Sequence, residues 1–181
     1  MEMHLKLSIR KHSNFKLAAK DITLIALMVA LIEASKAVLA SIPNVELTSF
    51  WIIMFTLYFG KRIFYVIPVF VLMEGMVFGF QIWWVMYLYA WPILAIVVLL
   101  LRKMKTAWEW SIVSGIFGLM FGFLCAIPYL FISGPQGAIA WWIRGIPFDL
   151  IHGVANFIIM MVLFYPMKYV MTKTAKLGYV S

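Results

Sequence analysis

Apolar residues fill most of this chain in long runs, and short polar or charged clusters interrupt the runs at regular intervals. A helix that crosses a membrane needs about 20 predominantly apolar residues. The pattern therefore predicts an all-α polytopic membrane protein, a compact bundle of six transmembrane helices. The expected spans cover residues 22–41, 47–59, 63–80, 83–101, 111–132 and 147–170.

The breaks between the runs carry residues that end helices. Pro43 and Asn44 close the first span, and the segment 133–137, rich in glycine and proline, is expected to be a loop before the sixth. Residues 1–20 are basic and mildly amphipathic, which predicts a short interfacial helix. Three regions follow: this N-terminal segment 1–20, the bundle 21–171, and a basic tail 172–181.

Composition and charge placement exclude a soluble protein and a nucleic-acid binder. Hydrophobic residues make up 65% of the chain and charged residues 12%, with a mean hydropathy of +1.00. The net charge is +8, and most of the basic residues that produce it lie at the ends of the apolar runs. All basic residues except Lys36 and Arg144 fall in segments 1–20, 60–62, 102–110 and 168–181. Six spans place those segments on one side, so the positive-inside rule predicts that both termini are cytoplasmic.

Three rows of small residues recur at four-residue spacing, which lets helices approach closely in lipid. For Ser114, Gly118 and Gly122, and for Gly75 and Gly79, we expect packing inside the bundle. The row Ala26, Ala30 and Ala34 has two interpretations, internal packing or a docking face for another membrane subunit.

Charged residues inside the apolar runs are costly, by about 2.5–3.5 kcal/mol at the bilayer centre, so each needs a partner or a purpose. Glu33 and Lys36 lie three residues apart on the first span and can pair with each other. Glu74, in the third span, has no partner nearby in the sequence.

The segment 141–156 is the richest in polar groups. Pro147 suits the first position of a helix, and Asp149 would then lie in the first turn, where its charge complements the helix dipole. Asp149, His152 and Asn156 form one stripe by helical spacing. The stripe is either a capping aspartate with an internally bonded histidine, or a polar ladder lining a solute pocket with Arg144 at its rim.

Aromatic residues gather in segment 83–91, where Trp84, Tyr87 and Trp91 share a helix face. Trp83 and Trp141 also suit an interfacial aromatic belt without a binding role. Deeper rings with few charges suit a ring-bearing, weakly charged solute.

The chain has no P-loop, HExxH or GxSxG pattern, and its single cysteine, Cys125, lies inside an apolar run as a core residue. We therefore expect no ATP site, no metal, no cofactor and no enzymatic activity of its own. Two alternatives stay open: a small intramembrane enzyme using Asp149 with His152, and a membrane assembly factor or channel.

The chain resembles the substrate-binding S components of energy-coupling factor (ECF) vitamin transporters. The resemblance covers nearly the whole chain and includes Ala26-Leu27-Met28-Val29-Ala30 in the first span. It also includes the loop Ile42-Pro43-Asn44-Val45-Glu46-Leu47 and the end of the second span at Phe59-Gly60. In that family the AxxxA face of the first helix meets the T subunit, and the first loop covers the site.

The resemblance implies a multi-pass subunit of a prokaryotic plasma membrane. It would capture a vitamin from outside and deliver it by docking on a T subunit with two ATPases, toppling in the membrane. The leading expectation for the solute is a cobalamin-related compound, with pantothenate, folate and pyridoxine- or pyrimidine-type vitamins open. Binding residues vary within the family, so the residues expected to bind the solute are chosen from their position in the chain: Asn44, Glu46, Trp84, Tyr87, Trp91, Arg144, Asp149, His152 and Asn156.

Overall fold

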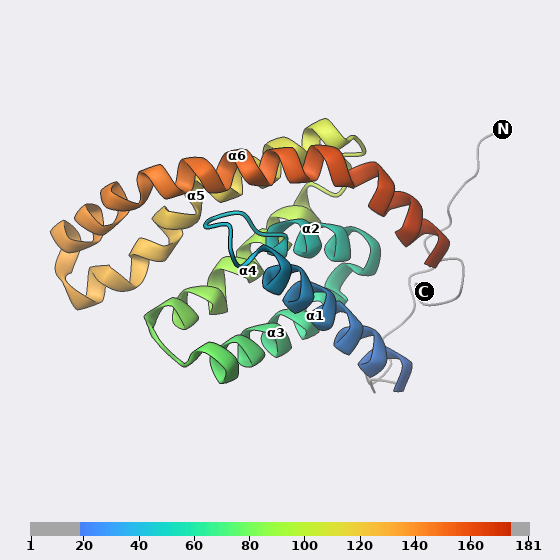
Figure 1. Ribbon diagram of the computed structural model, residues 1–181, viewed down its shortest axis with the longest axis horizontal. Helices are drawn as coiled ribbons and strands as arrows, with labels where there is room; N and C mark the ends of the chain where they lie inside the picture. Colours follow the sequence, from blue (N-terminus) through green and yellow to red (C-terminus); the bar gives the residue numbers. More distant parts are fainter. Residues whose placement is uncertain (1–18, 175–181) are drawn as a thin grey trace.

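The computed structural model describes residues 19–174, and every regular element among them is a helix (Figure 1). The elements are α1 (Ala19–Leu39), α2 (Thr48–Phe59), the 3-10 turn η1 (Gly60–Arg62), α3 (Ile63–Phe78), α4 (Ile82–Leu100), α5 (Ala107–Ile132) and α6 (Gly134–Thr174). The all-helical expectation is confirmed for this part of the chain. Residues 1–18 of the predicted interfacial helix and residues 175–181 of the basic tail lie outside the described residues, and Ala19 and Lys20 belong to α1.

Five stretches of the described chain are long and apolar enough to cross a membrane, as in a multi-pass membrane protein. They are α1, α4, α5, α6 and a combined stretch of α2, η1 and α3 over Thr48–Phe78. On its own, α2 has 12 residues and a length of about 18 Å, against about 30 Å of bilayer hydrocarbon.

Helix α2 lies at the centre of the fold, with α1, α3, α4, α5 and α6 all packed around it (Figure 1). Ten of its twelve residues are buried, so it is apolar on every side rather than along one stripe. Its side chains Phe50, Ile52 and Phe55 join Trp91 and Trp110 in the hydrophobic core. Helix α2 is therefore a core element that holds the longer helices together.

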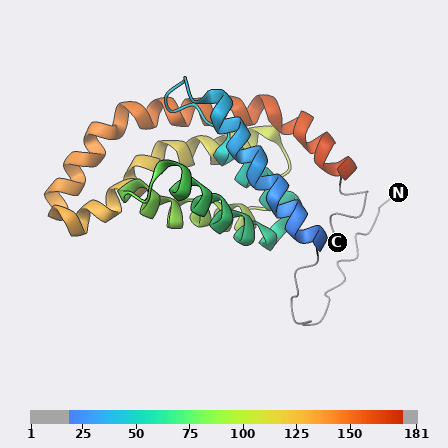
Figure 2. The same cartoon turned by 60° about the horizontal axis from the view of Figure 1, so that its bottom comes forward.

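Helices α5 and α6 form a long hairpin that extends beyond the other helices, with α6 arching over the molecule (Figures 1 and 2). Glycines let the two backbones touch. A Cβ atom on Gly118 would lie 2.8 Å from Cα of Gly153, and one on Gly115 would lie 3.3 Å from the Gly153 carbonyl oxygen. The row Ser114, Gly118 and Gly122 thus packs inside the bundle, as predicted.

The sixth helix is longer than the predicted span 147–170. Helix α6 begins at Gly134, whose φ is +72°, and runs without a break to Thr174. The predicted loop 133–137 is therefore almost entirely helical, and Pro147 lies inside the helix instead of at its first position. Asp149 is consequently in mid-helix, so the prediction that it complements the dipole of the first turn is wrong. Proline is tolerated inside helices of this kind where neighbouring groups satisfy the freed backbone.

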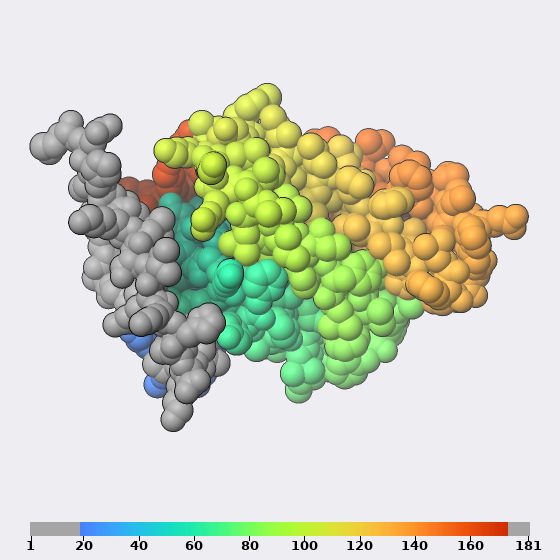
Figure 3. Space-filling view, turned by 180° about the vertical axis from the view of Figure 1, so that it is seen from behind, coloured from blue at the N-terminus to red at the C-terminus, as the bar shows by residue number. Residues whose placement is uncertain are grey.

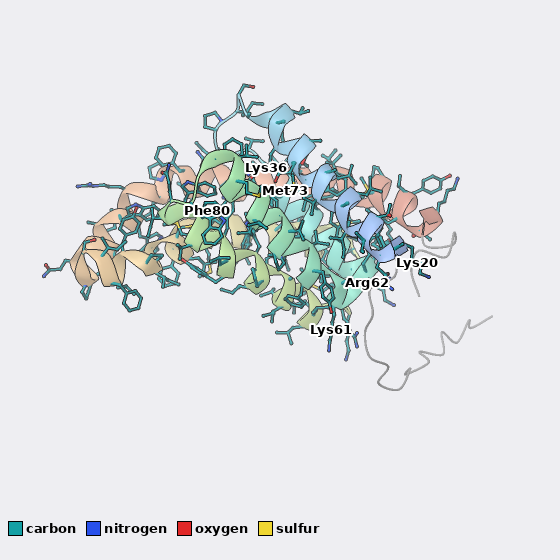
Figure 4. All side chains as sticks on the ribbon, turned by 90° about the horizontal axis from the view of Figure 1, so that it is seen from below. Lys20, Lys36, Lys61, Arg62, Met73 and Phe80 are labelled. Atoms are coloured by element: carbon teal, nitrogen blue, oxygen red, sulfur yellow. The ribbon has the colours of Figure 1, made fainter. Side chains whose placement is uncertain are left out.

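Basic residues from distant parts of the chain meet at one end of the fold. Arg62 of η1 pairs with Asp21 at the start of α1, with 3.3 Å between Nη2 and Oδ1. The hydroxyl of Tyr58 donates to the carbonyl oxygen of Lys168 over 3.3 Å, which brings the end of α6 to the end of α2. Lys20, Lys61 and Arg62 lie together in Figure 4.

Replacing Gly118 with alanine should destabilise the α5–α6 hairpin by about 1–3 kcal/mol, because the added methyl group overpacks against Gly153. Gly145→Ala is the matched control. Gly145 lies in the same hairpin with nothing within 4 Å of its Cβ position, so alanine there should gain up to about 1 kcal/mol from helix propensity. Thermal unfolding in detergent measures the stability of both variants. An equal change in stability for Gly118→Ala and Gly145→Ala would contradict the close packing of Gly118 on Gly153.

Candidate functional site

Polar side chains from four segments converge in the interior. We call Glu46, Ser49, Ser114, Asp149, His152 and Asn156 the polar core group. Nε2 of His152 lies 3.2 Å from Oε1 of Glu46. Asn156 donates from Nδ2 to the Ser49 hydroxyl over 3.2 Å and to the Ser114 carbonyl oxygen over 3.4 Å. Asp149, His152 and Asn156 are each at most 7% exposed. The predicted stripe on α6 therefore faces inward and connects the α1–α2 loop, α2 and α5.

Glu46 links the start of α2 to α6. Its carboxylate accepts hydrogen bonds from the backbone N–H groups of Thr48 and Ser49 over 3.0 and 3.3 Å, and from the Ser49 hydroxyl over 2.9 Å. A negative charge is favourable at a helix N-terminus. Burial alone would raise the pKa of Glu46, but His152, Thr48 and Ser49 together lower it from 4.5 to about 2. Because an ionised carboxylate only accepts hydrogen bonds, Nε2 of His152 carries the proton between them.

Asp149 is held against the backbone of α5. Its Oδ1 accepts a hydrogen bond from the N–H of Gly122 over 2.9 Å. A side chain at position 122 would collide with the Asp149 carboxylate, so only glycine permits this approach. The row of small residues on α5 therefore lets α5 pack closely on α6 and leaves space for the Asp149 carboxylate beside Gly122.

Four buried polar atoms in or beside the polar core group have no hydrogen-bond partner among the described residues. They are Oγ1 of Thr48, Nε1 of Trp91, Oγ of Ser114 and Oδ2 of Asp149. Such groups are rare in folded proteins, since each costs about 1–3 kcal/mol when buried without a partner. Two hydroxyl groups, one indole N–H and one carboxylate oxygen in this region therefore have hydrogen-bonding capacity that no described residue uses.

Five rings pack in a continuous series beside the polar core group. We call Phe70, Tyr87, Trp91, Phe117 and Phe121 the aromatic column. Tyr87 lies 5.2 Å from Trp91 and 6.2 Å from Phe70 between ring centroids. Phe121 lies 5.5 Å from Trp91 and 5.1 Å from His152. The column therefore connects α3, α4 and α5 directly to the histidine of α6.

An ion pair lies at the other end of the aromatic column. Lys36 of α1 pairs with Glu74 of α3, whose side chain is 2% exposed. The Lys36 ammonium also lies 5.4 Å from the Phe70 centroid and 5.6 Å from that of Tyr87, within cation–π range. The ion pair at contact distance is therefore with Glu74, whereas the sequence spacing predicts Glu33 as the partner of Lys36. Glu33, one turn earlier, interacts electrostatically with both members of the pair.

The structure gathers most of the predicted solute-binding residues but leaves three apart. Glu46, Tyr87, Trp91, Asp149, His152 and Asn156 belong to the two connected groups described above. Trp84 instead braces α4 on α3, donating from Nε1 to the Val71 carbonyl oxygen over 2.7 Å. Arg144 is exposed on α6. Asn44 is a turn residue with a φ of +60°, two positions before Glu46.

Other aromatic residues have local partners. Trp83 packs edge-on against Tyr87 at 5.3 Å, and Trp141 stacks on Tyr129 at 4.9 Å. Both tryptophans are half-buried, a position that suits an aromatic belt as well as it suits the rim of a site.

Sequence analysis missed Ser49, Ser114, Phe117, Phe121 and Gly122 as members of the site. Ser49 follows Glu46 by three residues at the start of a helix, a spacing that favours a capping interaction. For Gly122 the sequence predicts only a role in helix packing, because the contact with Asp149 depends on how α5 and α6 lie together. The phenylalanines carry no polar atom, so only their contacts with Trp91 and His152 identify them.

The alanine row on α1 faces outward. Ala26, Ala30 and Ala34 are all exposed, whereas Leu24, Met28, Val29 and Ile32 of the same helix are buried. Packing among residues 19–174 therefore does not occupy the row, which leaves this face open to another helix in the membrane as far as the described residues go.

The described residues contain no group of three or more His, Cys, Asp or Glu side chains that could hold a metal ion. Cys125 is buried and carries a free thiol. No family model matches this chain, and searches of curated proteins and of solved structures also found no match.

Glu46→Gln should destabilise the protein by about 1.5–3 kcal/mol at neutral pH, because the charged acceptor for α2 and His152 is lost. The lowered pKa means that this contribution is present above pH 4.5 and is lost as the pH falls towards 2. Thermal unfolding of both proteins between pH 7 and pH 3 measures the difference, which should shrink as the pH falls below 4.5. A difference that stays constant over this range would contradict the role given to the ionised carboxylate.

Proposed function

We propose that this protein is the membrane-embedded, substrate-binding S component of an ECF-type vitamin importer. It captures a vitamin-type solute from outside and delivers it by docking on a T subunit with two ATP-binding subunits. The observation that carries the proposal is the set of buried, unpartnered polar atoms beside the aromatic column. A solute that supplies hydrogen-bond partners and a ring face would satisfy both.

The position of the site supports capture from the side opposite the basic residues. Lys20, Arg62 and Lys168 come together at one end, the end that the positive-inside rule assigns to the cytoplasm. Glu46 lies in the loop between α1 and α2, which joins the other ends of these helices. In this proposal the chain reverses at Gly60, so that α2 is a short pass enclosed by the other helices and α3 runs back beside it. The chain then crosses six times and both termini are cytoplasmic.

The loop between α1 and α2 is suited to act as a lid. Its Glu46 bonds to His152, which packs on Phe121 of the aromatic column. Movement of the loop would have to break the bond between Glu46 and His152, whereas Asn44 and its neighbours are half-exposed or exposed. Opening this loop would give a solute access to the unpartnered groups.

The chemistry of the site suits a ring-bearing solute with polar substituents. Aromatic rings provide stacking surface, while hydroxyl, indole and carboxylate groups fix orientation. A cobalamin-related compound is the leading candidate, and pantothenate, folate and pyridoxine- or pyrimidine-type vitamins are the alternatives. Native mass spectrometry of gently purified protein identifies which of these co-purifies.

Thr48→Val should weaken solute binding by about tenfold, the equivalent of about 1.4 kcal/mol, because it deletes an unpartnered hydroxyl at nearly constant volume. The solute-free protein should change little in stability, since this hydroxyl makes no direct hydrogen bond and only adds to the groups that favour the Glu46 carboxylate. Thr56→Val on the same helix is the control: its buried hydroxyl donates to the Ile52 carbonyl oxygen over 2.6 Å, so solute affinity should not change.

Affinity is measured by titrating the co-purifying metabolite into solute-free protein. If Thr48→Val, Ser114→Ala and Asp149→Asn all bind the metabolite as the parent protein does, the solute lies elsewhere and the site is wrongly placed. Absence of any co-purifying small molecule, together with no binding of the vitamins named above, would contradict the proposal as a whole.

Ala30→Trp should leave solute binding intact but abolish assembly with the T subunit, because a large side chain prevents close approach on the exposed α1 row. Val162→Trp, at a position on α6 that is 62% exposed, is the control for a bulky residue on the outside of the bundle. Co-purification with the T subunit and ATPases measures assembly. Normal assembly of Ala30→Trp would place the docking face elsewhere.

A further inference from the structure

A groove of about 270 Å³ lies between α4 and α5, on the side of the molecule shown in Figure 3. All of its lining side chains are hydrophobic. Leu94 and Phe117 form its buried floor, whereas Ile116 and Met120 on its rim are 52% and 46% exposed. The groove is therefore open to the surroundings of the bundle, and those surroundings are lipid in a membrane.

The groove follows the helices over a length that suits an acyl chain. On α5 its lining extends from Val113 to Leu124, a distance of about 16 Å at 1.5 Å per residue. A helix from a partner protein has a diameter of about 10–12 Å with its side chains and could not enter a space this small. An extended hydrocarbon chain can.

One end of the groove opens beside a cluster of positive charge. Leu101 lines the groove and is followed at once by Arg102 and Lys103, with Lys105 two residues further. All three basic side chains are exposed, and no ion pair is found for them among residues 19–174. The one acidic neighbour, Glu109, is engaged in capping α5: its carboxylate accepts hydrogen bonds from the N–H and hydroxyl groups of Thr106 over 2.9 and 2.7 Å. The loop thus presents a net positive surface.

We propose that this groove is a binding site for one anionic phospholipid. An acyl chain lies between α4 and α5, and the phosphate contacts the basic loop of Arg102, Lys103 and Lys105. Basic residues at the cytoplasmic ends of transmembrane helices attract anionic headgroups. The groove suits an apolar chain and the loop suits a negative charge. A neutral lipid lacks the charge for the loop, and a free phosphate lacks the acyl chain for the groove. The inference requires only that the protein is in a membrane and is independent of the proposed transport function.

The groove also touches the candidate site from outside. Phe117 lines the groove and belongs to the aromatic column, with its ring centroid 5.8 Å from that of Trp91. A lipid chain on one side of Phe117 would therefore be separated from Trp91 by a single ring.

Native mass spectrometry of the full chain, titrated in detergent with phosphatidylglycerol or phosphatidylcholine of identical acyl chains, tests the proposal. One phosphatidylglycerol should bind about tenfold more tightly than phosphatidylcholine. The variant Arg102→Gln, Lys103→Gln, Lys105→Gln should bind both lipids alike. The matched control Lys20→Gln, Lys61→Gln, Lys173→Gln removes three other exposed basic residues and should keep the preference.

Val97→Phe with Val113→Phe should fill the groove and weaken binding of both lipids. If that variant does not fold, Met120→Trp on the exposed rim blocks the same space. The proposal is overturned if phosphatidylcholine binds as tightly as phosphatidylglycerol, if the loop variant keeps the preference, or if filling the groove leaves binding unchanged. Equal binding of glycerol 3-phosphate would also overturn it, since that result assigns the site to the loop alone.

Discussion

A carboxylate placed among apolar helices must find partners, and Glu46 shows how this chain provides them. The same two oxygens accept hydrogen bonds from the first amides of α2 and from His152 of α6. Helix α2 is buried on every side, so its position fixes the positions of the helices packed around it. The bond from Glu46 to His152 therefore sets the register of the longest helix against the most buried one. Without it, the buried ring of His152 would lose the hydrogen bond that its Nε2 makes.

Lys36 and Glu74 meet the same requirement elsewhere in the bundle. Their pair joins α1 to α3 and is enclosed by aromatic rings. A pair of opposite charges of this kind contributes little net stability compared with apolar packing, but removing either partner alone is strongly destabilising. Polar residues thus specify which helices lie side by side, while van der Waals packing of apolar and small residues provides most of the attraction between helices in lipid.

Sequence reasoning found the helices wherever charges or glycine mark the ends of apolar runs. The boundaries at Lys61 and Arg62 and at the basic loop after Leu100 are of this kind. It failed at Gly134, where Gly and Pro were interpreted as a loop, because glycine with a positive φ can also precede a helix directly. It found Asp149, His152 and Asn156 because helical spacing is visible in a sequence. It could not find the Lys36–Glu74 pair or the role of Phe121, because those contacts depend on how separate helices pack.

Helix α6 has 41 residues, which corresponds to a length of about 60 Å, roughly twice the thickness of the hydrocarbon layer. A rod of that length cannot stand upright in a bilayer without carrying one or both ends into the headgroups, so it must tilt, bend or protrude. Figure 2 shows it bent around the other helices. Because the helix is long, a rotation of 10° about one end would displace the other end by about 10 Å. Small changes in bilayer thickness or in the angle of the hairpin would therefore be amplified along this helix and across the residues it carries inward.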